Sequence, residues 1–161
     1  MKLNSRIPLI ILVLLIGFSA CKEDVYMDWK IKNQEWLDNL KEANKNDSTF
    51  HVTSSGLCYK VVYDGWQFNT KPNINSVVRV NYKGSLIDGS VFDSVATGKT
   101  IDLYLSSSIS GWQEALPKMH DTSNYILYIP YKLGYDTTST NSEIPPYSTL
   151  IFNITLKQTF N

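Results

Sequence analysis

The sequence has few of the side chains on which most enzyme chemistry depends. Only two cysteines occur among its 161 residues, and no CxxC pair is present, so nothing indicates a disulfide framework. The two histidines, His51 and His120, lie far apart and outside any HExxH pattern. The sequence also lacks a phosphate-binding glycine loop and a nucleophile elbow. These absences argue against metal-dependent, phosphoryl-transfer and serine-hydrolase chemistry.

An excess of charge of one sign is missing too. Fifteen basic and fifteen acidic residues give a formal net charge of zero at pH 7, so the chain has no basic field for nucleic acid. Hydrophobic residues make up 43% of the sequence, which is enough for a core, and the length predicts one domain with additional segments. We therefore expect no nucleic-acid partner, and nothing in the sequence requires a metal or a cofactor.

The N-terminus has the pattern of an export signal. Lys2 and Arg6 precede an apolar run over Leu9–Phe18, which is too short for a comfortable membrane span and ends in small residues. This run resembles a bacterial lipobox, in which the chain is cleaved before Cys21 and lipid is attached to the cysteine sulfur. The next residues, 22–24, resemble the surface-export signal of lipoproteins in Bacteroidota. The alternative is an ordinary signal peptide followed by an incidental cysteine.

These patterns predict three parts of the chain. Residues 1–20 are expected to be a signal peptide, and residues 21–49 a lipidated cysteine followed by a spacer and a helix. Residues 50–161 are expected to form the functional domain, held at the outer membrane by Cys21 and exported to the cell surface.

A helix is predicted over Val25–Asn44. Its apolar residues recur near one face, and no glycine or proline interrupts it. These residues are Val25, Trp29, Trp36 and Leu40. Two interpretations remain open, a spacer or pairing helix between membrane and domain, and a helix that packs on its own domain.

The stretch over 77–94 is the best-defined part of the domain. Val78, Val80 and Tyr82 alternate with neighbours that point the other way, which is the period of a half-buried strand. A glycine-rich turn leads to a second strand that contains Phe92 and Asp93. The hairpin therefore places a tyrosine, a phenylalanine and a carboxylate close together.

Further strands are predicted over 56–63, 101–105, 124–130 and 150–156. A short helix begins near Gly111, and Pro117 limits it to about two turns. Trp66 and Phe68 lie in the loop over 64–74, and we expect them to pack onto the sheet. Cys58 is expected to be a small buried side chain. Many strands around one short helix predict an α+β fold with an antiparallel sheet wrapped on the helix.

Four segments resemble the FKBP family of peptidyl-prolyl isomerases. In chain order they are VRVNYKGSLIDGSVFDS, SISGWQEALPKM, YIPYKLGY and IPPYSTLIFNITL, which together cover about residues 54–157. The resemblance implies an FKBP-like sheet curled around a short helix. It also implies acceleration of X–Pro bond rotation in proline-containing polypeptides, as a folding helper in the cell envelope. Macrolide immunosuppressants are a further ligand class that the resemblance implies.

The resemblance also implies a proline-binding pocket at eight positions. They are Tyr82, Phe92, Asp93, Ile109, Trp112, Tyr135, Ile144 and Phe152. Trp112 would form the floor under the proline ring, and Phe92 and Phe152 would be walls. The Tyr135 hydroxyl and the Ile109 N–H would donate to substrate carbonyls, while Tyr82 and Asp93 would pair at the rim.

Such a pocket needs no acid or base. Twisting an X–Pro bond destroys amide resonance, which sets a barrier of roughly 18–20 kcal/mol. The twisted amide has less charge separation, so a dry aromatic cavity binds it better than the planar form. Three positions depart from the family, since Ile101 and Leu103 replace aromatic residues and Ser108 replaces a valine. The alternative is therefore a lipoprotein that binds proline peptides without catalysis.

Overall fold

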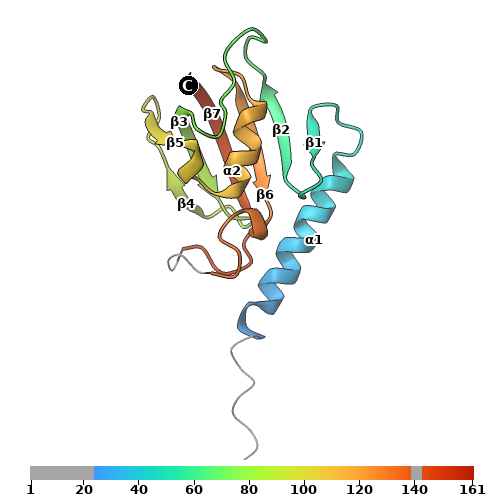
Figure 1. The fold of residues 1–161 in the computed structure, drawn as a ribbon. Helices are drawn as coiled ribbons and strands as arrows, with labels where there is room; N and C mark the ends of the chain where they lie inside the picture. Colours follow the sequence, from blue (N-terminus) through green and yellow to red (C-terminus); the bar gives the residue numbers. More distant parts are fainter. Residues whose placement is uncertain (1–23, 139–142) are drawn as a thin grey trace, which may run out of the picture.

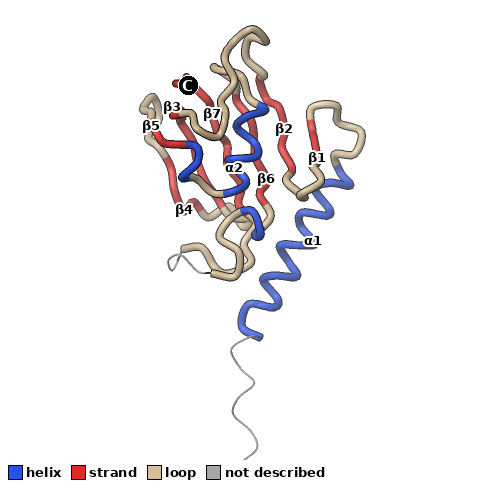
Figure 2. The backbone as a smooth tube through the Cα atoms, in the orientation of Figure 1, coloured by secondary structure: helices blue, strands red, loops and turns tan. Residues whose placement is uncertain are grey.

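One curved antiparallel sheet organises the chain, and a short helix lies across it (Figures 1 and 2). The computed structural model describes residues 24–138 and 143–161. Its strands are β1 (Phe50–Val52), β2 (Cys58–Tyr63), β3 (Val77–Ser85), β4 (Val91–Ser94), β5 (Ile101–Tyr104), β6 (Asn124–Ile129) and β7 (Leu150–Phe160). Its helices are α1 (Met27–Ala43) and α2 (Ser110–Ala115), with single 3-10 turns at Asp24–Tyr26, Leu105–Ser107, Leu116–Lys118 and Tyr131–Leu133. Within the described ranges, no helix has the length and apolar character required to cross a membrane.

The strands follow the order β1-β2-β6-β7-β3-β4, and β5 pairs with β3 on the edge that β4 also uses, away from β7. All of these pairings are antiparallel, so the predicted α+β architecture is confirmed. The long strand β7 is central, because Phe152 lies opposite Leu127 of β6 and Gly84 of β3. Its alternating apolar residues are buried as the sequence predicted, namely Leu150, Phe152, Ile154 and Leu156.

The core lies between the sheet and α2. Trp112, Ala115, Leu116 and Met119 are buried there against the apolar face of the strands. Pro117 sits in the 3-10 turn that follows α2, so the helix ends early, as expected from the missing N–H of proline.

Helix α1 packs against the domain, as the second of the two interpretations of this segment predicts (Figure 1). The Trp29 Nε1–H donates to Ser148 Oγ at 2.9 Å, and the Thr149 N–H donates to Asn33 Oδ1 at 2.8 Å. The predicted apolar face is partly wrong, because Val25 is 70% exposed and the fully buried positions of α1 are Asn33 and Leu37. The spacing of apolar residues does not predict that Asn33 is buried, because the N–H that bonds to it belongs to Thr149, 116 residues further along the chain.

Two other sequence predictions have different outcomes. Cys58 is fully buried, and burial raises the pKa of its thiol, as expected of a structural cysteine. Trp66 and Phe68 do not pack onto the sheet, since they are 63% and 80% exposed. The predicted signal peptide and Cys21 lie outside the described residues.

Candidate active site

Five separate segments bring aromatic side chains to one end of α2. Tyr82 comes from β3, Phe92 from β4, Trp112 from α2 and Phe152 from β7. Tyr135 follows the 3-10 turn after β6. The strand period explains this convergence, because Tyr82 and Phe152 both point to the face of the sheet that α2 covers.

The rings meet edge to face. The Trp112 ring centroid lies 5.1 Å from that of Tyr82 and 5.2 Å from that of Phe152, with interplanar angles of 85° and 81°. Phe92 approaches Phe152 at 5.5 Å and 85°. In this arrangement the positive edge of one ring points at the negative face of the next, which is an attractive geometry for aromatic rings. The cluster is therefore held rigid by its own contacts.

Gly84 makes this close approach possible. A Cβ atom at this position would come within 2.7 Å of the Phe92 ring and 2.8 Å of the Phe152 ring. Gly84 is paired with Phe152 of β7 on one side and with Asp93 of β4 on the other. Gly84 lies inside β3 and not in the turn that follows it. A glycine within an otherwise regular strand is the available signal that another group approaches closely.

A cavity of about 240 Å³ opens in front of this cluster. It is lined by Tyr82, Asp93, Leu103, Ser107, Ser108, Ile109, Trp112, Tyr135 and Phe152. Six of these are among the eight residues that the sequence analysis predicted. Trp112 and Phe152 are each only 4% exposed, so these two rings at the base of the cavity have little contact with solvent.

Two predicted site residues lie behind the cavity lining. Phe92 supports the wall through its contact with Phe152. Ile144 is buried in the hydrophobic core and is 4% exposed. Ile101 also lies outside the lining, because it is 40% exposed, whereas Leu103 and Ser108 form part of it. Ser107 is a lining residue that sequence reasoning missed, since a serine-rich turn carries no pattern that distinguishes one serine from its neighbours.

A tyrosine–carboxylate pair closes the rim. The Tyr82 hydroxyl donates to Asp93 Oδ2 at 2.6 Å. Burial raises the pKa of Tyr82 far above its usual range, and the hydrogen bond to the Asp93 carboxylate adds to this shift. Burial likewise raises the pKa of Tyr135, with a smaller contribution from the charge of Asp93. Both phenols are therefore neutral hydrogen-bond donors throughout the physiological pH range.

Three donors along the cavity make no hydrogen bond within the described part of the chain. They are the Ile109 backbone N–H, the Tyr135 hydroxyl and the indole N–H of Trp112. Buried polar groups are nearly always paired in folded proteins, so the orphaned Trp112 Nε1 is unusual. A cavity with free donors and apolar walls can bind a group that combines a carbonyl with a compact apolar ring.

Titratable side chains do not gather anywhere in residues 24–138 and 143–161 as a metal site requires. No group of three or more His, Cys, Asp or Glu side chains is arranged to hold an ion there. The only carboxylate that lines the cavity is Asp93, and it is already bound by Tyr82. What this geometry provides is shape, apolar walls and hydrogen-bond donors.

Comparison with known proteins gives the same picture. The sequence profile of the FKBP-type peptidyl-prolyl cis-trans isomerases matches residues 69–157. An outer membrane protein MIP of Legionella longbeachae is 40% identical over 126 residues, which cover 78% of this chain and 53% of that protein. An FKBP-type 22 kDa peptidyl-prolyl cis-trans isomerase of Escherichia coli is 40% identical over 116 residues, covering 71% and 55%.

The crystal structure of FkpA from Escherichia coli resembles this fold with a TM-score of 0.75 and 31% identity. The match covers 85% of this chain and 63% of that one. The chain spans about half the length of the two relatives above. The profile match includes β3 to β6, β7 as far as residue 157, and every residue that lines the cavity. The chain therefore belongs to the family of FKBP-type peptidyl-prolyl cis-trans isomerases.

Proposed function

We propose that this protein accelerates cis–trans isomerisation of X–Pro bonds in polypeptides, as a folding helper in the cell envelope. The observation that carries the proposal is the cavity walled by the rings of Trp112, Phe152 and Tyr82, next to the unpaired Ile109 N–H and Tyr135 hydroxyl. Family membership and the isomerase names of the relatives support the same activity.

The mechanism is selective binding of the twisted amide. The proline ring packs on the indole of Trp112, and Phe152 closes one side. The Tyr135 hydroxyl and the Ile109 N–H bind carbonyls of the substrate chain and hold it while the imide bond turns. Because the twisted bond has less charge separation than the planar amide, apolar walls favour it, and no proton has to move. A barrier lowered by ~5 kcal/mol corresponds to a rate gain of ~10³–10⁴.

The test is cis–trans exchange of a proline tetrapeptide measured with the purified full chain. We expect acceleration by the wild type, a fall of about tenfold or more for Trp112→Leu, and a smaller fall for Tyr135→Phe. Tyr131→Phe is the matched control, because Tyr131 packs on Tyr147 outside the cavity. A well-folded wild type that leaves the exchange at the uncatalysed rate would rule the activity out.

One observation favours a second candidate, a module that binds proline peptides without turning them over. Leu103, Ser107 and Ser108 make one side of the cavity less aromatic than the other. Binding of the tetrapeptide without acceleration supports this candidate, and Trp112→Leu then abolishes the binding. A macrolide immunosuppressant that competes with the peptide would show that the same cavity accepts bulky rings.

The proposed location is the outer membrane, through lipid on Cys21, with the domain exported to the surface. The supporting observations are the apolar run that ends just before Cys21 and the relative named as an outer membrane protein. Mass spectrometry of the protein purified from membranes tests this directly. The expected result is loss of residues 1–20 and an added lipid mass on Cys21, and an unmodified Cys21 contradicts it.

A further inference from the structure

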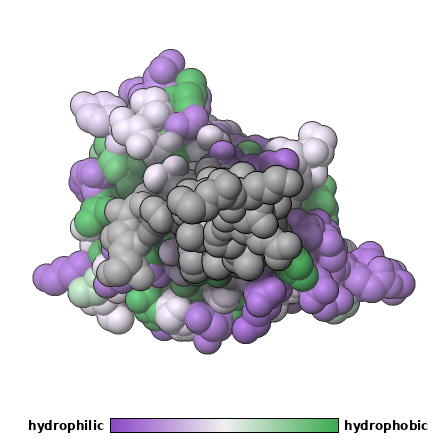
Figure 3. All heavy atoms as spheres, turned by 90° about the horizontal axis from the view of Figure 1, so that it is seen from below, coloured by the Kyte–Doolittle hydropathy of each residue, from purple (hydrophilic) through white to green (hydrophobic). Residues whose placement is uncertain are grey.

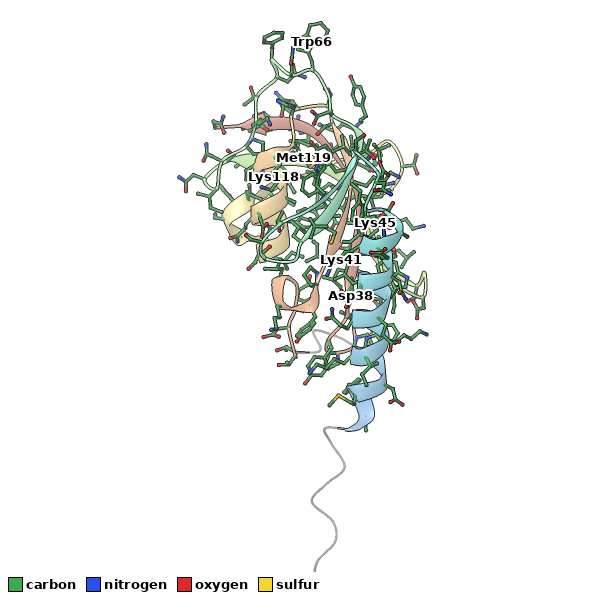
Figure 4. The ribbon with its side chains drawn as sticks, turned by 90° about the vertical axis from the view of Figure 1, so that its right-hand side faces the viewer. Asp38, Lys41, Lys45, Trp66, Lys118 and Met119 are labelled. Carbon is green, nitrogen blue, oxygen red and sulfur yellow. The ribbon has the colours of Figure 1, made fainter. Side chains whose placement is uncertain are left out.

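A pair of exposed aromatic side chains lies at the end of the molecule opposite the N-terminal helix. Trp66 and Phe68 occupy the tip of the loop between β2 and β3, and their ring centroids are 6.3 Å apart. Figure 4 shows Trp66 at one extremity, with the N-terminal end of α1 at the other. Tyr63, at the end of β2, is 57% exposed and precedes the loop. We call Trp66 and Phe68 the aromatic tip.

The aromatic tip stands on a firmly bound base. The Tyr125 hydroxyl donates to Asp64 Oδ1 at 2.5 Å, just before the loop. Gly65 has a φ of +71°, and a Cβ there would come within 2.7 Å of the Asp121 carbonyl oxygen. Asn69 Nδ2 donates to that same oxygen at 2.9 Å, so the two sides of the loop close on Asp121.

Two further bonds close the base. The Asp121 N–H donates to the Thr70 carbonyl at 2.9 Å, and Lys71 Nζ donates to the Lys118 carbonyl at 3.2 Å. The loop thus holds its two aromatic side chains out toward solvent on a fixed frame. A frame of this kind lowers the ordering cost of binding. The segment from Gly65 to Thr70 carries no charged residue, which suits contact with apolar groups.

The occupants that the chain itself could supply are excluded by reach and by area. The proposed cleavage before Cys21 would leave three residues before Asp24, and a segment of three residues reaches at most about 10 Å. Two aromatic side chains bury at most about 500 Å² together, below the ~800 Å² per partner of a stable interface. A dimer held by the aromatic tip alone is therefore too small to persist.

The end of the molecule at which the N-terminal residues lie has a different surface. Figure 3, which views that end, shows apolar residues as separate spots among hydrophilic ones around the uncoloured atoms. A chain anchored at that end directs the aromatic tip away from the bilayer. The remaining partner is a polypeptide in solution around the domain. A small, uncharged pair of aromatic side chains is suited to weak binding of many different sequences.

We infer that the aromatic tip is a second contact site for unfolded polypeptide, where it binds apolar side chains of the chain whose proline occupies the cavity. This deepens the proposed function and rests on it. The cavity lies at the start of α2, by Ile109 and Trp112, and the base of the tip lies beside Lys118 and Asp121. The nine residues of α2 and its 3-10 turn span about 15 Å. An extended chain covers the distance from the cavity to the base of the tip in about five residues, so an unfolded client longer than this can reach both sites.

Two linked weak sites raise the binding of a long chain but not of a short peptide. The test compares two substrates of the full chain inserted into phosphatidylcholine nanodiscs. One is a proline tetrapeptide, which reaches only the cavity, and the other is a reduced and carboxymethylated protein whose refolding is limited by a proline. We expect Trp66→Ser with Phe68→Ser to lower kcat/KM for the refolding protein about three- to tenfold, and to leave the tetrapeptide unchanged.

The matched control is Trp66→Leu with Phe68→Leu, which keeps the tip apolar and retains most of the refolding rate. Equal refolding rates for the serine pair and the wild type overturn the inference, as does an equal loss with both substrates. A direct measurement separates this inference from the proposed activity. A photoreactive phenylalanine analogue at position 68 should crosslink to the carboxymethylated protein even if no isomerisation is detected, and absence of that crosslink overturns the second site.

Discussion

Aromatic residues have opposite surroundings at the two ends of α2. At the cavity end, Trp112 and Phe152 are 4% exposed, whereas Trp66 and Phe68 at the aromatic tip are 63% and 80% exposed. The difference comes from the backbone that carries them. Strands and a helix turn the cavity rings toward one another, and Gly84 lets them meet, while a short turn closed by the Asn69 N–H on the Trp66 carbonyl projects the tip outward. Residue type alone therefore does not determine burial.

The cavity cluster and the aromatic tip should differ most in what their rings contribute to the free energy of unfolding. Phe152→Ala removes a ring that contacts Tyr82, Phe92 and Trp112, and should lower the free energy of unfolding by about 3–5 kcal/mol. Phe68→Ala removes the same side chain from the tip and should change it by less than about 0.5 kcal/mol. Urea unfolding followed by circular dichroism measures both. Similar losses for the two variants would show that the tip is packed in solution.

Gly84→Ala tests the close approach of the rings. The added methyl group collides with Phe92 and Phe152, so we expect a loss of about 1–3 kcal/mol in unfolding free energy together with weaker proline-peptide binding. Gly89→Ala is the control, because its φ is +88° and no atom lies within 4 Å of the new Cβ. It should cost about 1–2 kcal/mol through backbone strain alone and leave peptide binding intact. Unchanged binding in Gly84→Ala contradicts the role given to this glycine.

Each end of α2 also has one tyrosine–aspartate hydrogen bond, which allows a matched pair of variants. Tyr82→Phe loses the bond to Asp93, and Tyr125→Phe loses the bond to Asp64, so each should cost about 1–2 kcal/mol of unfolding free energy. Tetrapeptide exchange should fall only with Tyr82→Phe. The ratio of the refolding rate to the tetrapeptide exchange rate, which measures the contribution of the tip, should fall only with Tyr125→Phe. Equal effects of both variants on both substrates would mean that the two ends are not independent.

The smallest effect is expected at alkaline pH. Burial, aided by the nearby carboxylates, raises the pKa of Tyr82 and Tyr125 above the ordinary value of about 10. As pH rises, the unfolded chain therefore loses these protons before the folded one does. The contribution of these two tyrosines to the free energy of unfolding should be constant below about pH 10 and should fall above it. Denaturant unfolding at pH 9 to 11 measures the slope, which should be shallower in Tyr82→Phe, and an identical slope contradicts the assignment.

Sequence reasoning reached most of the fold because the period of the apolar residues is regular. The alternation in β3 and β7 predicted their buried faces, and Pro117 predicted where α2 ends. Only the resemblance to a family drew residues as distant as Tyr82 and Tyr135 into one site, since no local pattern links them.

The failures also have physical causes. Trp66 and Phe68 were expected on the sheet because aromatic residues are usually buried, but a loop has no periodicity that shows which way a side chain points. Ile144 was expected in the cavity and lies in the core. The inner face of α1 depends on Asn33, whose burial is compensated by a backbone N–H far along the chain, and that partner cannot be identified from a single helix.

The attachment of α1 has one more consequence. Trp29 Nε1–H donates to Ser148, and the Thr149 N–H donates to Asn33, immediately before the strand that carries Phe152. A force applied at the N-terminal end of α1 is therefore transmitted along a helix of about 25 Å to the start of the central strand β7. The helix and the domain that carries the cavity therefore keep one fixed orientation relative to each other.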